Sequence, residues 1–378
     1  NRMKKKVLSL LLAVVMTFSL AVTANAAEET AQDLDGDIVI LHTNDVHGAI
    51  SGYAKVAALK DAYEARGAYV LLMDAGDFIQ GDPTVSTSEG ATAVELMNLA
   101  DYDVASMGNH EFDYGMENFL TLAKDKAEYT YLCCNFTDLD GKAVLDAYKL
   151  VDYGGVTVGY VGIDTPESFT KSTPTYFQND KGEYIYSFSQ GNEGKDLYDA
   201  VQKAVDDATK AGADYVVALG HLGNEGSTDV WTSKSVIANT TGIDVFIDGH
   251  SHSTQEDIMA ALGGTVTDAG DVTVTIGTDM VNGTVLTSAG TKLEEVGVVT
   301  IDEAGHIDAR TTSLESLTAT DADVAARAAK IQAEIDKEYG TVFAKTEVAL
   351  NGEKEPGNRT EETNLGDLIC DALVWGAE

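Results

Sequence analysis

Short apolar runs alternate with segments of helical periodicity over the first two thirds of the chain. The runs are continuous rather than alternating with polar residues, which is typical of strands covered on both faces. Predicted strands lie at residues 38–41, 69–73, 104–107, 129–134, 156–163, 215–219 and 245–247, and predicted helices at residues 53–66, 91–100, 116–126 and 194–211. Strands that alternate with helices in this way indicate an α/β domain.

The pattern changes after residue 260. Residues 260–310 are rich in Thr, Val and Gly, with hairpin-like turns such as Val281-Asn282-Gly283-Thr284, and they predict short antiparallel strands. Residues 322–339 carry apolar side chains at helical spacing and predict an amphipathic helix. Residues 351–360 are rich in Gly, Pro and charge and predict a linker, and residues 364–375 begin another element.

The first 26 residues have the three regions of a secretory signal peptide. Lys4-Lys5-Lys6 precede an apolar stretch at 7–22, which ends in the small residues Ala24-Asn25-Ala26. A transmembrane anchor is the alternative, but the apolar stretch is short and a cleavage site follows it. We therefore exclude residues 1–26 from the fold and expect a secreted, periplasmic or cell-wall associated protein without a stable membrane insertion.

The composition is strongly acidic. Residues 1–26 hold four of the 25 Lys and Arg and none of the 62 Asp and Glu, so the remainder has 21 basic against 62 acidic residues, a net charge of −41. This charge argues against a nucleic acid polymer as partner, because phosphate backbones are bound by clustered Lys and Arg. A single nucleotide held by metal ions remains compatible. The three cysteines, Cys133, Cys134 and Cys370, are too few for a disulfide framework.

Polar side chains follow five of the predicted strands, and the segment Gly108-Asn109-His110-Glu111-Phe112-Asp113 concentrates an amide, an imidazole and carboxylates in one turn. Five of the seven histidines lie in such turns: His47, His110, His221, His250 and His252. Imidazole nitrogen combined with carboxylate or amide oxygen suits Zn²⁺, Mn²⁺ or Co²⁺. The groups are too many for one ion, whereas two ions ~3.5–4 Å apart that share a carboxylate would use them and suit displacement at phosphorus.

Each of these histidines taken alone is better explained as a structural residue, and the metal hypothesis rests on the set. For His42 we expect a structural hydrogen bond, and for His306, in a predicted hairpin turn, exposure to solvent. Asp74 and Asp82 flank the turn of Asp77, and we expect them to form turns or to support ligands rather than to bind metal.

Five polar blocks occur in the order of the motifs of calcineurin-like metallophosphoesterases, which the chain resembles over residues 37–378. They are Asp45-Val46-His47, Gly76-Asp77, Gly108-Asn109-His110-Glu111-Phe112-Asp113, Gly220-His221 and Gly249-His250-Ser251-His252. Leu41-His42-Thr43-Asn44-Asp45 and the segment 359–368 resemble the secreted branch that contains 5′-nucleotidases, UDP-sugar hydrolases and 2′,3′-cyclic-nucleotide phosphodiesterases.

The resemblance implies a role for each matching residue. Asp45, His47 and His252 would hold one divalent metal ion, Asn109, His221 and His250 the other, and Asp77 would bridge them. A metal-bound hydroxide would attack phosphorus in a nucleotide or related phosphoester. His110 would stabilise the transition state or protonate the leaving oxygen, with Asp113 orienting its ring. Some relatives carry Gln or Asn in place of His252, which bears on the choice of metal.

The resemblance also implies a four-layer αββα sandwich and a domain division. We expect the catalytic domain at residues 27–320, a linker helix and following segment at 321–350, and at 351–378 the start of a truncated substrate-binding domain. Of that domain's binding residues only Arg359 matches a phosphate-contacting position. Base specificity and any cell-surface attachment would depend on missing C-terminal residues, and the three activities of the branch share the metal site. A catalytically silent secreted binding protein is the alternative outside the enzymes.

Overall fold

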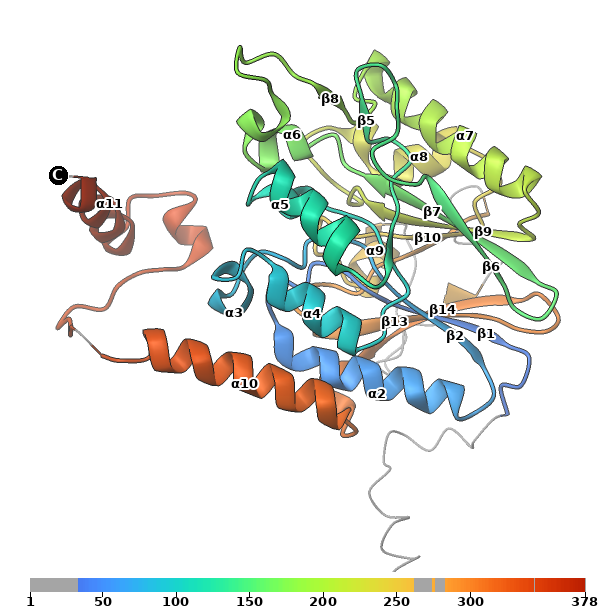
Figure 1. Cartoon of the computed structure of the whole chain (residues 1–378), viewed down its shortest axis with the longest axis horizontal. Helices are drawn as coiled ribbons and strands as arrows, with labels where there is room; N and C mark the ends of the chain where they lie inside the picture. Colours follow the sequence, from blue (N-terminus) through green and yellow to red (C-terminus); the bar gives the residue numbers. More distant parts are fainter. Residues whose placement is uncertain (1–32, 262–273, 276–282, 343, 378) are drawn as a thin grey trace, which may run out of the picture. The chain divides into compact units, whose positions relative to one another are not determined.

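The computed structural model describes residues 33–261, 274–275, 283–342 and 344–377 (Figure 1). The predicted signal peptide and the Val281-Asn282 part of the predicted hairpin turn lie outside these residues. Contacts divide the chain into two compact units, Asn1–Gln332 and Ala333–Glu378, which are described separately. Among the described residues, no helix combines the length and the apolar character that a bilayer crossing requires.

Two β-sheets form the centre of the first unit. The seven-stranded sheet has the order β11 (Val274–Thr275), β14 (Ile307–Ser313), β13 (Glu295–Ile301), β1 (Ile38–Thr43), β2 (Tyr69–Asp74), β3 (Val104–Ala105) and β4 (Thr130–Tyr131). The five-stranded sheet has the order β12 (Val285–Thr287), β10 (Val245–Ile247), β9 (Tyr215–His221), β7 (Thr157–Asp164) and β6 (Tyr148–Asp152). A small third sheet pairs β5 (Thr137–Asp138) with β8 (Tyr186–Ser187).

Strands β1 to β4 run parallel to one another, as do β7, β9, β10 and β12. The remaining strands β6, β11, β13 and β14 pair antiparallel at the sides of the two sheets. Each sheet therefore has one edge at which the carboxyl ends of its parallel strands lie together, which is where α/β folds place their sites.

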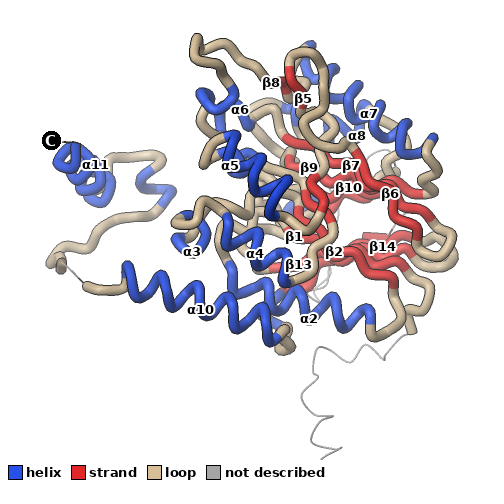
Figure 2. Tube along the Cα trace, viewed as in Figure 1, coloured by secondary structure: helices blue, strands red, loops and turns tan. Residues whose placement is uncertain are grey.

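Helices cover the outer face of each sheet, and Figures 1 and 2 show the resulting layers. The helices of the first unit are α2 (Tyr53–Glu64), α3 (Pro83–Ser86), α4 (Ala91–Leu99), α5 (Met116–Thr121), α6 (Ser168–Lys171), α7 (Lys195–Lys210), α8 (Ser233–Asn239) and α9 (Gln255–Ala261). Two further helices are α10 (Ala322–Tyr339) and α11 (Asn364–Ala377). The first residues of α10 belong to the first unit, and α11 belongs to the second.

The alternation of side chains along β1 shows why the strands are apolar on both faces. Val39 and Leu41 pack with residues of α2, α4 and α10, whereas Ile38 and Ile40 pack against the five-stranded sheet. A third cluster lies between the five-stranded sheet and α7, α8 and α9. The three cores separate four layers, so the αββα sandwich expected from the resemblance is confirmed.

Most of the predicted elements are present, and three predictions need correction. The strand predicted at 104–107 is confined to Val104–Ala105. The apolar run at 129–134 forms a strand only over Thr130–Tyr131. Beyond Tyr131 the chain leaves the sheet, and Leu132 forms only an isolated bridge with Asp146. Antiparallel strands were predicted for 260–310, and β13 pairs with β14 in that way. However, Val285–Thr287 joins the other sheet parallel to β10, so the prediction is wrong for that strand.

Candidate metal centre

The polar turns after β1, β2, β3, β9 and β10 meet at one edge of the sandwich. Backbone hydrogen bonds join the first two turns, since Asp45 N donates to Gly76 O at 2.9 Å and His47 N donates to Asp77 O at 3.1 Å. The turn after β10 reaches across from the other sheet, because the His250 N–H donates to the Asp45 carboxylate at 3.0 Å. Residues from both sheets therefore line one site.

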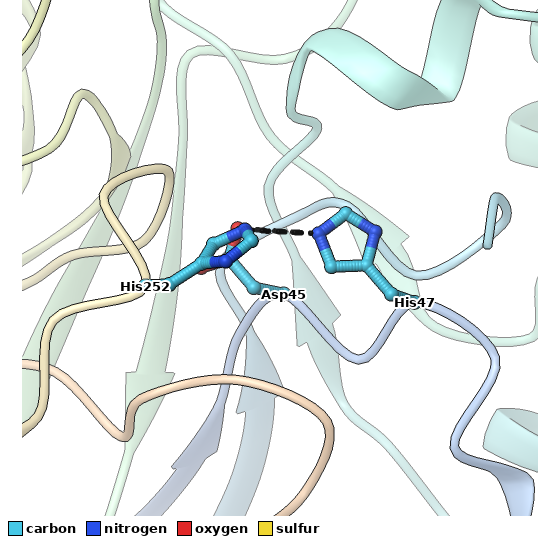
Figure 3. Close-up of side chains that lie close together, drawn as sticks. All are labelled: Asp45, His47 and His252. Carbon is cyan, nitrogen blue, oxygen red and sulfur yellow. Dashed lines mark hydrogen bonds and ion pairs between the residues drawn. The ribbon is translucent and has the colours of Figure 1, made fainter. Parts of the chain in front are cut away.

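Asp45, His47 and His252 form the first group of side chains that could hold an ion (Figure 3). His47 Nε2 lies 3.1 Å from His252 Nε2, and Asp45 Oδ1 lies 3.4 Å from His252 Nε2 and 3.9 Å from His47 Nε2. Ligands about 2.1 Å from a tetrahedral ion are about 3.4 Å from one another, so the spacing fits one. Asp45 is buried, whereas the His252 side chain is 43% exposed.

Asp77, His221 and His250 form the second group. His221 Nδ1 donates to Ala75 O at 2.7 Å, so its Nε2 is the nitrogen left for an ion. That Nε2 lies 3.1 Å from Asp77 Oδ2 and, although buried, has no aligned hydrogen bond. Asn109 Oδ1 is likewise buried without a hydrogen-bond partner. Buried polar atoms are rarely left unpaired, so these two atoms indicate places where an ion would bind.

The electrostatics of the metal-free site also fit cations. Burial lowers the pKa of His47 and lowers that of His252 to about 4, which keeps both imidazoles neutral and able to ligate. Burial raises the pKa of Asp45 to about 7, and the nearby Asp77 adds to this effect. A carboxylate that is costly to ionise without a partner is one that a bound cation would stabilise.

The backbone of this site is strained. Five of the seven predicted ligands have left-handed φ angles between 45° and 75°: Asp45, His47, Asp77, His250 and His252. For residues other than glycine such conformations are uncommon and cost of order 1–3 kcal/mol each. The strained backbone angles fall on the predicted ligands. This indicates that the directions of these side chains, rather than the stability of the turns, determine the backbone conformation.

Gly108 leaves space that the ligands occupy. A Cβ atom there would lie 2.4 Å from Asp77 Oδ1 and 2.6 Å from His221 Nε2. Any larger residue would displace two of the predicted ligands, which explains glycine directly before Asn109.

His110 and Asp113 form a hydrogen-bonded pair beside the two groups. His110 Nδ1 lies 2.6 Å from Asp113 Oδ2, and Ser172 Oγ donates to Asp113 Oδ1 at 2.9 Å. Burial opposes protonation of His110, but the Asp113 hydrogen bond and the charge of Asp77 outweigh it and raise its pKa to about 9. The His110 ring centroid is 5.4 Å from that of His47, so the pair lies next to the first group.

The other polar residues considered in the sequence make contacts, or have positions, that do not require a metal ion. Asp82 Oδ1 accepts from Thr84 N and caps α3, and buried Asp74 accepts from Thr43 Oγ1 and Gly76 N. His42 is buried beside Thr287 Oγ1, at 3.3 Å. His306 is exposed in the turn between β13 and β14. Arg359 is an exposed residue of the second unit.

Two buried carboxylates support the site without having been predicted. Glu111 accepts hydrogen bonds from the backbone N–H groups of Asp77, Phe78 and Gly108, and so joins the turns after β2 and β3. Glu167 accepts from His250 Nε2. Glu167 belongs to the polar segment that follows β7, and applying the strand-end rule to that strand would have included it.

Comparison with known proteins identifies the family of this chain. The model of calcineurin-like phosphoesterases matches residues 38–254. A snake venom 5′-nucleotidase from Gloydius brevicauda is 27% identical over 367 residues, covering 90% of this chain and 58% of that protein. The 5′-nucleotidase of Homo sapiens is 26% identical over 371 residues, covering 89% and 60%. The chain thus spans about 58–60% of the length of these two relatives.

Solved structures share the fold. A 5′-nucleotidase precursor from Thermus thermophilus superposes with a TM-score of 0.66 at 23% identity, over 90% of this chain and 67% of that one. A calcineurin-like phosphoesterase from Bacillus subtilis gives 0.62 at 21% identity, over 81% and 99%. At this identity the similarity supports the sandwich fold alone.

Proposed function

This chain belongs to the calcineurin-like phosphoesterase family, and on that premise we propose that it is a metal-dependent hydrolase of nucleotide phosphoesters, of the 5′-nucleotidase type. The observation that carries the proposal is the pair of ligand groups at one edge of the sandwich, next to the His110–Asp113 pair. The 5′-nucleotidases among the relatives support the choice of substrate. The venom relative and the signal-like residues 1–26 support action outside the cytoplasm.

The ligand assignment follows the two groups. Asp45, His47 and His252 would hold one ion and Asn109, His221 and His250 the other, with Asp77 between them. The mixed nitrogen and oxygen donors favour Zn²⁺, Mn²⁺ or Co²⁺. When bound, such ions lower the pKa of water and neutralise charge on the phosphoryl oxygens.

His110 supplies the proton in this proposal. Because Nδ1 is bonded to Asp113, its Nε2 is the nitrogen free to face a leaving-group oxygen. Without metal the Asp113 hydrogen bond and the Asp77 charge raise the pKa of His110 to about 9, and the Asp113 hydrogen bond would favour the protonated ring, as a general acid requires, with ions bound as well. Asp113 fixes the ring orientation, and Ser172 in turn holds the Asp113 carboxylate. For Arg359 we propose a contact with the substrate phosphate.

The test measures metal content and hydrolysis on the same preparation. We expect the protein, after addition of Mn²⁺ or Zn²⁺, to bind about two ions per chain and to release phosphate from nucleoside 5′-monophosphates. A panel that adds a UDP-sugar and a 2′,3′-cyclic nucleotide distinguishes the other activities of the branch. Protein that stays metal-free and inert would contradict the proposal and favour a silent binding protein.

A further inference from the structure

Glu167 is a buried carboxylate that contacts His250 of the second ligand group. Its side chain is 2% exposed, and its Oε2 lies 3.0 Å from His250 Nε2. The Lys171 Nζ atom is 3.7 Å from the same oxygen, but the Lys171 side chain is 49% exposed. His250 is therefore the buried partner of this carboxylate, and a hydrogen bond to an ionised acceptor is stronger than one between neutral groups.

The second oxygen of Glu167 fixes another loop. Oε1 accepts from the backbone N–H of Ser227, and a Cβ atom at Gly226 would lie 2.8 Å from it. Glu167 itself follows β7, Ser227 follows β9 and His250 follows β10. One carboxylate thus connects three strand ends of the five-stranded sheet.

The hydrogen bond determines which nitrogen of His250 can face an ion. An imidazole that donates from Nε2 to a carboxylate keeps its lone pair on Nδ1. The backbone of His250 is held as well, since its N–H donates to Asp45. His221 has the opposite arrangement, because its Nδ1 donates to Ala75 O and its Nε2 remains available to an ion. The two histidines of the second group would therefore present different nitrogens to the same ion.

We propose that Glu167 is a positioning residue, which holds His250 in the tautomer and orientation that present Nδ1 to the second ion. This inference rests on the proposed two-metal function. Carboxylates that accept from a ligating imidazole orient the ring and raise its basicity, and their removal commonly costs 10–100-fold in metal affinity. The loss should fall on the second ion, because His47 and His252 of the first group do not contact Glu167 in the described hydrogen bonds.

The experiment compares Glu167→Ala and Glu167→Gln with Lys171→Ala. The lysine variant is the matched control, because it removes the exposed partner of Glu167 and leaves the bond to His250 intact. Each protein is stripped of metal and titrated with Co²⁺, with the visible absorption of bound Co²⁺ and calorimetry as readouts. Glutamine keeps an oxygen acceptor for His250 but loses the charge, so its effect should be the smaller.

We expect wild type and Lys171→Ala to bind two ions, and Glu167→Ala to bind the first normally and the second about 10–100-fold more weakly. A second readout is the ¹⁵N spectrum of His-labelled, metal-free protein. The Nε2–H tautomer of His250 should be present in wild type and lost in Glu167→Ala, which a purely structural role of Glu167 would not predict.

Wild-type affinity for the second ion in both Glu167 variants would overturn the inference. Equal weakening of both ions, together with a lower melting temperature, would also overturn it, since that pattern describes general loosening. If Glu167→Ala does not fold, Glu167→Gln alone decides by the same criteria. Wild type that binds no Co²⁺ would overturn the proposed function, and this inference with it.

Discussion

At the scale of single residues, the candidate site is marked by buried polar atoms without an aligned hydrogen bond and by backbones in uncommon conformations. Asn109 Oδ1 and His221 Nε2 are buried without hydrogen bonds, and five predicted ligands are in the left-handed region. Both features cost free energy in the metal-free protein. The proposed metal binding would explain why they occur together, since side-chain directions that suit an ion differ from those that suit the isolated chain.

Replacing His110 should separate proton transfer from metal binding. We expect His110→Asn to lower kcat by about 10²–10⁴-fold, the usual contribution of a general acid, with unchanged metal content. Asp113→Asn should lower kcat less, because the imidazole remains. Phosphate release and metal analysis on the same sample provide the measurement.

His306→Asn is the control for that experiment, since His306 is an exposed turn residue and its replacement should leave kcat unchanged. If His110→Asn instead emptied the site of metal, His110 would be a ligand and its assignment as the acid would be wrong.

The sequence could predict the candidate ligands because strand ends are visible as polar residues after apolar runs. Asp45, His221 and His250 all follow that rule. The same rule applied to β7 would have included Glu167 as a candidate, but it could not predict that Glu167 pairs with His250 or that Ser172 pairs with Asp113, because these contacts depend on which loops meet in space. Ser172 contacts Asp113 across 59 positions of sequence and Glu167 contacts His250 across 83, and neither pairing leaves a local pattern.

At the scale of elements, hydrophobic periodicity predicted whether a segment forms a helix or a strand better than it predicted which strand a given strand pairs with. Residues 322–339 form α10 with the predicted bounds, because the apolar positions repeat at helical spacing. Val285–Thr287 is a strand, but its place in the five-stranded sheet beside β10 follows from the path of the chain between sheets. A strand of three buried residues, Val285, Leu286 and Thr287, fits either sheet, so the local pattern could not specify the pairing.

The packing of α10 gives a prediction at this scale. Ile331 is 3% exposed and packs in the core on the helix side of the seven-stranded sheet. Ile331→Ala should lower the free energy of unfolding by about 2–5 kcal/mol, as large-to-small core substitutions do. Urea unfolding followed by circular dichroism measures the change.

Leu99→Ala is a suitable comparison, because Leu99 ends α4 and is 46% exposed. We expect it to cost less than about 1 kcal/mol. If Ile331→Ala lowered the free energy of unfolding no more than Leu99→Ala does, α10 would contribute little to the core.

At the scale of the whole molecule, metal binding should be linked to pH. Folding raises the pKa of Asp45 from 3.8 to about 7, mainly by burial. Between these values the folded, metal-free protein keeps a proton that the unfolded chain has lost, so this group's contribution to stability falls as pH rises. A bound ion replaces that proton, and apparent metal affinity should therefore rise with pH.

We expect the apparent affinity to increase by up to about tenfold per pH unit from pH 5, and less steeply as pH approaches 7, for release of the Asp45 proton. His252, with a pKa of about 4, is already neutral in this range and so adds little to the trend. Chelator competition at several pH values measures the slope, and the melting temperature should fall when EDTA removes the metal. An affinity independent of pH would contradict the raised pKa of Asp45.

The hydrogen bond from His250 to Asp45 has a consequence for the order of events during folding. It joins residues 205 positions apart, one after the first strand and the other after β10 of the opposite sheet. Closing so long a loop is entropically costly and is repaid only when both sheets have formed. During synthesis, Asp45 and His47 leave the ribosome about 200 residues before His252, at least ~10 s earlier at ordinary elongation rates. The first proposed ligand group therefore becomes complete late, so any metal loading should follow assembly of the sandwich rather than guide it.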